Sequence, residues 1–145
     1  WPGSPQTLVR VEEVARADVC NTVTGEPELS LLPGAAALDA LAAQRGFEWI
    51  RTTSRPLPET TYAVIEIGQR TNGGYSLAVS RDAALEGDAL LLSATYFEPQ
   101  QGRWASDQPS SPCVAVALPE GVSFGRVRVF DQSGRVRVSS DGDGA

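Results

Sequence analysis

Hydrophobic and polar residues alternate along several short stretches of this chain, most of them after residue 61. Alternation with a period of two is typical of strands that have one buried face. Clusters of Gly, Pro, Asn, Asp and Ser separate the stretches, which favours turns between them. The stretches that we expect to form strands are LVRVEEV (8–14), 19–23, TYAVIEI (61–67), YSLAVS (75–80), ALLLSATYF (89–97), CVAVAL (113–118), RVRVF (126–130) and RVRVSS (135–140).

One segment, residues 35–45, has a helical period instead. Leu38, Leu41 and Ala42 recur at the i, i+3, i+4 spacing that places side chains on one helix face. Gly46 follows at the position where helices often end in a left-handed residue. The spacing therefore predicts a single helix, packed on the sheet by its apolar face.

The chain after this helix is expected to return to the core through Phe47, Trp49 and Ile50. SRPLPET (54–60) then forms a rigid connection because proline fixes the backbone. DQSG, between the last two strands, predicts a hairpin turn with Gly134 in the left-handed conformation. The fold class is mainly β (α+β): an antiparallel β-sandwich or small barrel of about seven or eight strands with one packed helix.

The composition is typical of one soluble globular domain over residues 1–145. The chain is 41% hydrophobic and 21% charged, which suits an ordinary core. We expect residues 139–145 to form a flexible tail. The net charge of −6 argues against nucleic-acid binding, which needs a cationic surface. The best apolar window, 34–46, is too short for a membrane span, so no transmembrane segment is expected in this chain.

Two features of the sequence point to export: the way the chain begins and its pair of cysteines. The chain contains no Met and opens WPGSPQ, so we expect that an initiator and an exported leader preceded residue 1. Cys20 and Cys113 are the two cysteines. In an exported protein (periplasmic, outer-membrane-anchored or secreted) they would form one structural disulfide, whereas two buried thiols are the alternative.

The sequence contains fragments of catalytic and metal-binding motifs, but the other residues that these motifs need are absent. GVSFG (121–125) matches the nucleophile-elbow pattern, but a strand-like stretch follows it and the chain has no His. DGDG (141–144) resembles the start of a calcium loop without its distal ligands. The chain lacks Lys, which a phosphate loop needs, and two cysteines without His make a poor zinc site. We therefore expect no enzyme activity, no metal and no cofactor.

The last two predicted strands would gather four guanidinium groups on one side of a hairpin: Arg126, Arg128, Arg135 and Arg137. Like charges across a sheet repel, so an acidic neighbour is expected. That neighbour is either an acidic partner or a glutamate of the chain itself, with Glu12, Glu13 and Glu66 as candidates. The long connection 98–112 also contains Arg103 and Trp104, which form either a binding loop or a lid over the sandwich end.

GQRTNGGYSLAVS (68–80) carries a family resemblance. Together with IEIG (65–68) and SPCVAVALP (111–119), it resembles the PrcB C-terminal-like family of bacterial exported proteins over about residues 61–119. Asn72 departs from that family's Thr-Gly-Gly-Tyr spacing. The resemblance implies a protease-associated or partner-binding module without catalytic residues to transfer.

A weaker resemblance links RTNGGY (70–75) to chagasin-like cysteine protease inhibitors, which are immunoglobulin-like sandwiches that insert loops into the protease cleft. Our functional hypothesis is a protein-binding domain, acting as a protease inhibitor or an accessory subunit. Gly73 and Gly74 would allow positive φ and close approach to a partner, while Tyr75 anchors the next strand. The expected partner-binding residues are Thr71, Asn72, Gly73, Gly74, Arg103 and Trp104. The alternative is an envelope-assembly protein that pairs through the arginine hairpin or a sheet edge.

Overall fold

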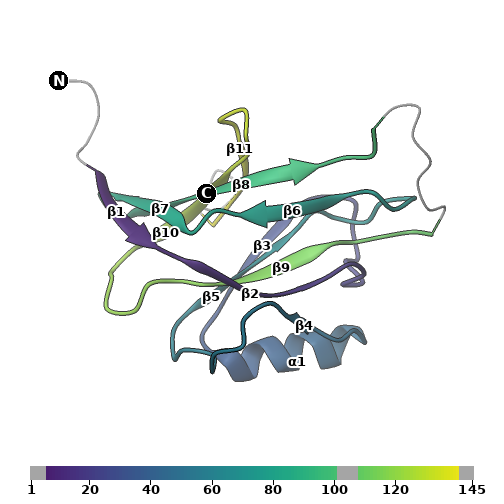
Figure 1. Cartoon of the computed structure of the whole chain (residues 1–145), viewed down its shortest axis with the longest axis horizontal. Helices are drawn as coiled ribbons and strands as arrows, with labels where there is room; N and C mark the ends of the chain where they lie inside the picture. Colours follow the sequence, from purple (N-terminus) through teal and green to yellow (C-terminus); the bar gives the residue numbers. More distant parts are fainter. Residues whose placement is uncertain (1–5, 101–107, 141–145) are drawn as a thin grey trace.

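Eleven strands and one helix make up the regular structure of residues 6–100 and 108–140, which the computed structural model describes (Figure 1). The helix is α1 (Ala35–Arg45). The strands are β1 (Gln6–Arg10), β2 (Glu12–Ala17), β3 (Glu28–Leu32), β4 (Ile50–Arg51), β5 (Tyr62–Glu66), β6 (Ser76–Val79), β7 (Asp82–Glu86), β8 (Ala89–Phe97), β9 (Cys113–Ala117), β10 (Arg126–Phe130) and β11 (Val136–Ser139).

The strands form two sheets that face each other (Figure 1). Sheet 1 has the order β1-β7-β8-β10-β11, and β6 pairs with the far half of β8. Sheet 2 has the order β3-β5-β9-β2-β4. Neither sheet closes into a barrel, so of the two predicted architectures the sandwich is confirmed. Pairing is antiparallel except between β8 and β10, which run parallel because the chain crosses from sheet 2 back to sheet 1 before β10.

Burial shows three layers: sheet 1, sheet 2 and α1. Alternate residues of both sheets form the core between them, including Ile65, Leu90, Val116 and Val127. The other face of sheet 2 is covered by α1 through Leu38 and by Trp49 and Phe47 of the segment that follows (Figure 1, bottom). All five residues of β5 and of β9 are therefore buried, which explains why these two strands carry apolar or small residues on both faces, with Glu66 at the end of β5 as the exception.

The helix begins and ends where its periodicity predicts. Leu38 and Ala42 are its buried residues, and Gly46 takes the left-handed conformation with φ 78°. The N–H of Gly46 donates to the carbonyl of Ala42, which caps the last turn. Trp49 then packs edge-on against Phe47, and its indole N–H donates to the carbonyl of Leu38 at 2.9 Å. Ile50, by contrast, is exposed in the edge strand β4, so its predicted place in the core is wrong.

The first predicted strand, 8–14, is divided between the two sheets. β1 pairs with β7 in sheet 1 and β2 pairs with β9 in sheet 2. Val11 lies at the crossing, buried in the core, and its N–H donates to the carbonyl of Arg81. Apolar and polar residues alternate through the crossing without a turn residue. For this reason the sequence pattern could not show that the predicted strand is divided between two sheets.

Other elements also differ from the expected ones. Residues 19–23 do not form a strand: Val19 makes one bridge to Ser111, and Asn21 has a φ of 54°. β3, β4 and β7 were not predicted, because their sequences do not alternate clearly. Ser139 and Ser140 were expected both in the strand 135–140 and in a tail. Ser139 ends β11, as the strand prediction has it, and the Oγ of Ser140 accepts the N–H of Val127 at 2.8 Å. Within the described ranges, no helix is long and apolar enough to cross a membrane.

Candidate functional site

Three segments that are distant in the sequence meet at the end of the sandwich where β9 begins. We call them together the loop end: residues 18–25 after β2, residues 68–75 between β5 and β6, and residues 108–112 before β9. The segment 68–75 contains the four predicted loop residues. Arg103 and Trp104 lie outside the described residues.

A disulfide joins the first of these segments to the first residue of β9, directly after the third segment. Cys20 and Cys113 are bonded, with their Cα atoms 6.1 Å apart, so the predicted pairing is confirmed. Ser111 adds a second connection: its carbonyl and its Oγ accept the N–H of Cys20, both at 3.0 Å. The same Oγ accepts the N–H of Asn21 at 2.9 Å. These bonds fix residues 18–21 against the start of β9.

Arg70 connects the first and second segments. Its guanidinium donates to the carbonyls of Ile67 at 3.1 Å and Gly25 at 2.9 Å. It also lies over the ring of Tyr75, 5.6 Å from the ring centroid, a cation–π arrangement. Tyr75 is partly buried and packs against the core, as expected of a residue that anchors the strand β6. Arg70 covers the outer face of its ring.

Backbone pairing ties the second segment to the third. Arg70 and Ser110 exchange two backbone hydrogen bonds of 2.7 and 3.0 Å. The hydroxyl of Ser110 donates to the carbonyl of Asn72 at 2.7 Å. The loop is therefore held from both sides by contacts within the chain.

Two glycines let the backbone segments approach each other. Gly68 has a φ of 104°, and a Cβ there would lie 2.6 Å from the carbonyl oxygen of Gly25. Gly74 has a φ of 92°, and a Cβ there would lie 2.8 Å from Cγ of Pro99. Other residues are strained at such φ values. Positive φ is therefore confirmed at Gly74 and is also found at Gly68, whereas Gly73, for which it was predicted as well, does not have it.

The exposed part of the loop end combines small, polar and apolar groups. Thr71 and Gly74 are exposed, whereas Asn72 and Gly73 are half-buried. The neighbouring Val23 is 84% exposed. A hollow of about 310 Å³ lies beside Gly73, Gly74 and Tyr75 and is closed on the other side by residues 108–112. The Oδ1 atom of Asn72 is buried without a hydrogen-bond partner among the described residues, which leaves one acceptor unsatisfied.

Two aspartates face the arginine hairpin: Asp131 in its own turn and Asp88 in the turn between β7 and β8. Arg126 lies 3.3 Å from a carboxylate oxygen of Asp88, and Arg137 lies 3.3 Å from Asp131. Arg135 also faces Asp131, at 3.8 Å, and Arg137 stacks on Tyr96. The predicted glutamates are engaged elsewhere: Glu12 with Arg55, Glu13 with Arg16 and Glu66 with Arg45. That interpretation was wrong because an aspartate of the turn itself reaches back to the strand.

GVSFG forms a connection between β9 and β10. Gly121 has a φ of 71°, Phe124 packs against the core, and the strand β10 follows directly. Gly125 donates its N–H to the carbonyl of Asp88 at 2.7 Å. In the part of the chain that the structure describes, no group of three or more His, Cys, Asp or Glu residues is arranged to hold a metal ion.

Sequence reasoning missed the residues that brace the loop end, above all Arg70, Ser110 and Ser111. Arg70 directly precedes the predicted loop, and an arginine beside a glycine-rich turn was a usable signal. No local pattern marks the two serines, because their role depends on the pairing of segments that are far apart in sequence.

Comparison with known proteins gives one match. Residues 61–119, less than half of the 145-residue chain, match the model of the family described as PrcB C-terminal. This confirms the resemblance expected from GQRTNGGYSLAVS and supports a role connected with a protease complex. No curated protein and no solved structure matches the chain.

Proposed function

We propose that this chain, whose residues 61–119 match the PrcB C-terminal family, is a non-enzymatic exported domain that binds a protease. It acts as an inhibitor or as an accessory subunit of a protease complex. The contact is made by the loop end, with Thr71, Asn72, Gly73 and Gly74 in its centre. Arg103 and Trp104 belong to the same proposal, although they lie outside the described residues.

The observation that carries this proposal is that the loop end is cross-linked by several contacts and still has exposed residues. A disulfide, the guanidinium of Arg70 and the Arg70–Ser110 backbone pair hold its three segments together. A loop fixed in its bound shape loses little conformational entropy on association, which favours binding. Inhibitory and accessory loops both need this property because the protease must meet one defined surface.

The composition of the loop end suits an extended peptide-binding cleft on the partner. Thr71 and Gly74 are exposed on the loop, and Val23 offers an exposed apolar contact. The buried disulfide supports export, because disulfides persist in oxidising compartments. The periplasm, an outer-membrane anchor and secretion all fit.

Capture by inactive proteases tests the proposal. The immobilised chain is offered a papain-like cysteine protease and a subtilisin-like serine protease, each with its catalytic nucleophile replaced by alanine. We expect at least one to bind, and Val23→Asp and Gly74→Arg to weaken this binding at least tenfold, roughly the effect of losing one central contact. Hydrolysis assays with the active enzymes then distinguish an inhibitor from an accessory subunit.

A variant with charge reversal at Arg126 and Arg135 is the matched control, since both lie on the hairpin at a distance from the loop end. Circular dichroism checks that Gly74→Arg is folded, because its backbone is strained. Binding that survives both loop variants but is lost on charge reversal would contradict the proposal. That result would favour the second candidate, an envelope-assembly protein.

The open edge of sheet 1 favours the second candidate, an envelope-assembly protein. Among the described strands, β1 pairs with β7 alone, so its other edge carries no partner, and Leu8 on this strand is 82% exposed. An open edge strand can pair with another chain. If assembly through this edge is the function, sedimentation will show self-association that Leu8→Lys reduces.

A further inference from the structure

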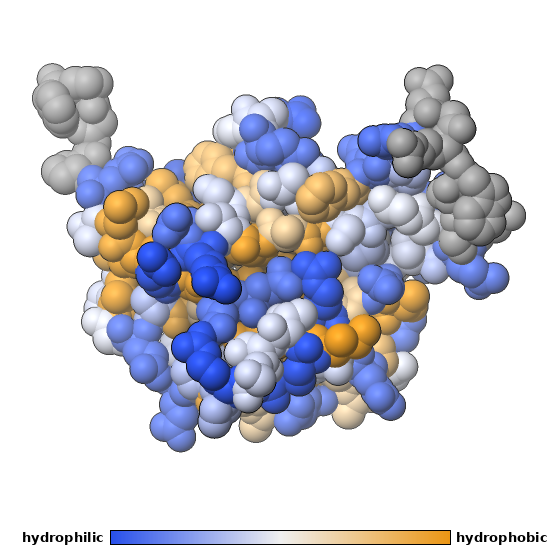
Figure 2. All heavy atoms as spheres, viewed as in Figure 1, coloured by the Kyte–Doolittle hydropathy of each residue, from blue (hydrophilic) through white to orange (hydrophobic). Residues whose placement is uncertain are grey.

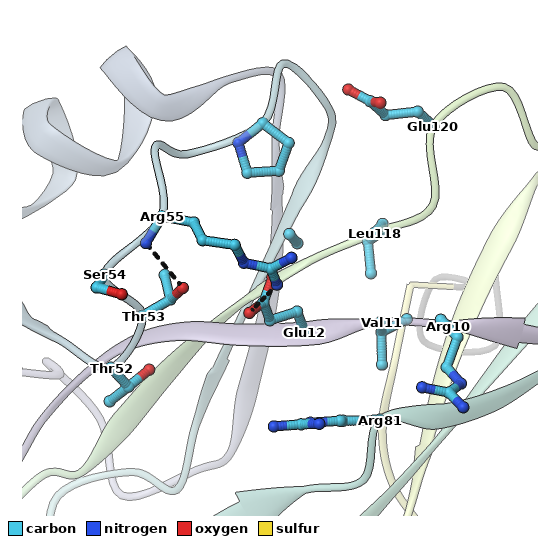
Figure 3. Close-up of a pocket in the computed structure, with 12 residues that line it drawn as sticks. Arg10, Val11, Glu12, Thr52, Thr53, Ser54, Arg55, Arg81, Leu118 and Glu120 are labelled. Atoms are coloured by element: carbon cyan, nitrogen blue, oxygen red, sulfur yellow. Dashed lines mark hydrogen bonds and ion pairs between the residues drawn. The ribbon is translucent and has the colours of Figure 1, made fainter.

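A second and larger hollow lies at the opposite end of sheet 2 from the disulfide. Its volume is about 770 Å³, and four separate segments form its walls. These are the crossing from β1 to β2, the connection after β4, the corner between β6 and β7, and the end of β9 with the residues that follow. Figure 3 shows the side chains that line it, with Val11 and Leu118 in the middle. We call this hollow the arginine cleft.

Three arginines from three of these segments point into the arginine cleft: Arg10, Arg55 and Arg81 (Figure 3). Figure 2 shows strongly hydrophilic side chains gathered on this face, where β1 runs into β2. The whole chain has a net charge of −6 with 12 basic residues, so a quarter of its basic side chains meet at one hollow. Only Glu12 and Glu120 bring negative charge to the same walls.

The three arginines differ in how their charge is balanced. Arg55 lies 2.5 Å from a carboxylate oxygen of Glu12, and Arg10 lies 3.3 Å from one of Asp82. The Arg10–Asp82 pair is more than three-quarters exposed on both sides, so water and ions compete with it readily. Arg81 makes no side-chain hydrogen bond and no ion pair with any described residue, although its charge acts on Glu12 from a distance. One guanidinium of the cleft is therefore free to take an external anion.

The chemistry of the walls selects the kind of anion. A guanidinium presents its N–H groups in a planar fork that matches the two oxygens of a carboxylate. The floor contributes Val11 and Leu118, which are almost fully buried, so the arginines dominate what the cleft presents to a ligand. Glu12 already shows this pairing within the cleft, because its carboxylate is bound by Arg55.

We propose that the arginine cleft binds a carboxylate group, with Arg81 as its main charge partner and Arg10 as the second. The carboxylate belongs either to a small organic acid or to an acidic peptide. This site is separate from the loop end and does not depend on the proposed protease partner. Glu12 competes with the ligand for Arg55 and thereby limits affinity.

Arginine side-chain NMR signals of the full chain provide the test. The probes are succinate, a capped peptide of three glutamates, and succinamide as the uncharged match of succinate, all at constant ionic strength. We expect saturable shifts of the Nε–Hε signals of Arg81 and Arg10 with at least one acidic probe and none with succinamide. The probe that binds more tightly identifies the source of the carboxylate.

Two variants and a control assign the site. Arg81→Gln should weaken binding at least about tenfold, the usual effect of losing a charge-assisted hydrogen bond. It should not disturb folding, because the contact that Arg81 makes to Val11 uses its backbone carbonyl. Glu12→Gln should strengthen binding several-fold, since it removes the competing carboxylate. Arg126 is an exposed arginine of the hairpin, and Arg126→Gln should leave the affinity unchanged.

Three results would overturn the proposal. The first is the absence of a saturable shift with both acidic probes. The second is an Arg81→Gln variant that binds as the unchanged chain does. The third is an equal loss in Arg126→Gln, which would mean that the probes only screen surface charge.

Discussion

Asp131 organises the turn between β10 and β11 at the scale of a single residue. Its Oδ1 accepts the hydroxyl of Ser133 at 2.6 Å and the backbone N–H groups of Ser133 and Arg135 at 2.8 and 3.1 Å. Its Oδ2 lies 3.3 Å from the guanidinium of Arg137. These donors, led by the Ser133 hydroxyl, hold the pKa of the Asp131 carboxyl well below its ordinary value of 3.8.

This shift predicts an acid-dependent contribution to stability. Because the folded pKa of Asp131 lies below the unfolded one, the contribution is fully present above about pH 4 and is lost as the pH falls further toward the folded value. Asp131→Asn should therefore destabilise the protein clearly at pH 7 and less at pH 2, as measured by urea unfolding. Asp39→Asn, on the exposed side of α1, is the control and should show no such difference. A destabilisation of equal size at both pH values would contradict the assignment.

Residues with an obvious conformational role were predictable one by one. Gly134 and Gly46 have the positive φ that turn and helix-end positions require, and the two cysteines are paired. Arg70, Ser110 and Ser111 were not predictable because a side chain that donates to distant carbonyls leaves no mark in its own neighbourhood. Four candidate residues, 71–74, do lie on the loop end, but the serines that support the loop end come from the segment just before β9, about 40 residues further along the chain.

Packing of α1 on sheet 2 includes one buried ion pair at the scale of elements. Glu66 of β5 is fully buried on the helix side of sheet 2. Its carboxylate is bound by the guanidinium of Arg45, the last residue of α1, and accepts the hydroxyl of Thr22 at 2.6 Å. Both carboxylate oxygens have donors, which offsets the cost of burying the charge. Glu66 therefore connects the end of α1, through Arg45, with Thr22 in the segment that follows the disulfide.

Removing one partner of this pair should be costly. Arg45→Met leaves the Glu66 carboxylate buried with fewer donors, so we expect a loss of about 3–5 kcal/mol in the free energy of unfolding. Arg10→Met removes an ion pair that is mostly exposed, and the expected loss is below about 1 kcal/mol. Chemical denaturation of both variants at pH 7 measures the difference. Equal losses would show that the Arg45–Glu66 pair contributes no more than a surface contact.

Elements with a strong local pattern agree with their predicted bounds. α1 and β8 have the predicted ends, because a helical period or a long alternation specifies them. β3 and β7 have weaker patterns and form because neighbouring strands β5 and β8 offer them an edge. The division of 8–14 at Val11 has a similar cause: two sheets compete for one strand, and each takes half of it.

The disulfide acts at the scale of the whole molecule. It connects residues 93 positions apart and thereby links the N-terminal third of the chain to the central strand of sheet 2. Both cysteines are buried between sheet 2 and α1. Closing so long a loop limits the unfolded chain more than the folded one. The loop end is attached to this point and should keep its shape only while the bond is intact.

Replacing both cysteines by alanine tests that dependence. We expect the free energy of unfolding to fall by about 2–5 kcal/mol, the usual range for a native disulfide. Amide hydrogen exchange in the folded variant should increase first at residues 18–25 and 108–112, because Ser111 alone then holds them together. Val129 and Leu90, in the core of sheet 1, serve as internal controls and should remain protected. Faster exchange spread evenly over the molecule would contradict a local role.

The sequence by itself determined the β-rich class, the single predicted helix, the family likeness over 61–119 and the position of the glycine loop, since each depends on residues that are close together along the chain. Only the tertiary structure decided the sandwich over the barrel, the division of the first strand, the parallel β8–β10 pair and the acids that balance the hairpin arginines. It also brought the three arginines of the cleft together from three segments. These features depend on which distant segments pair, and packing of the whole core selects that pairing because no short stretch contains both partners.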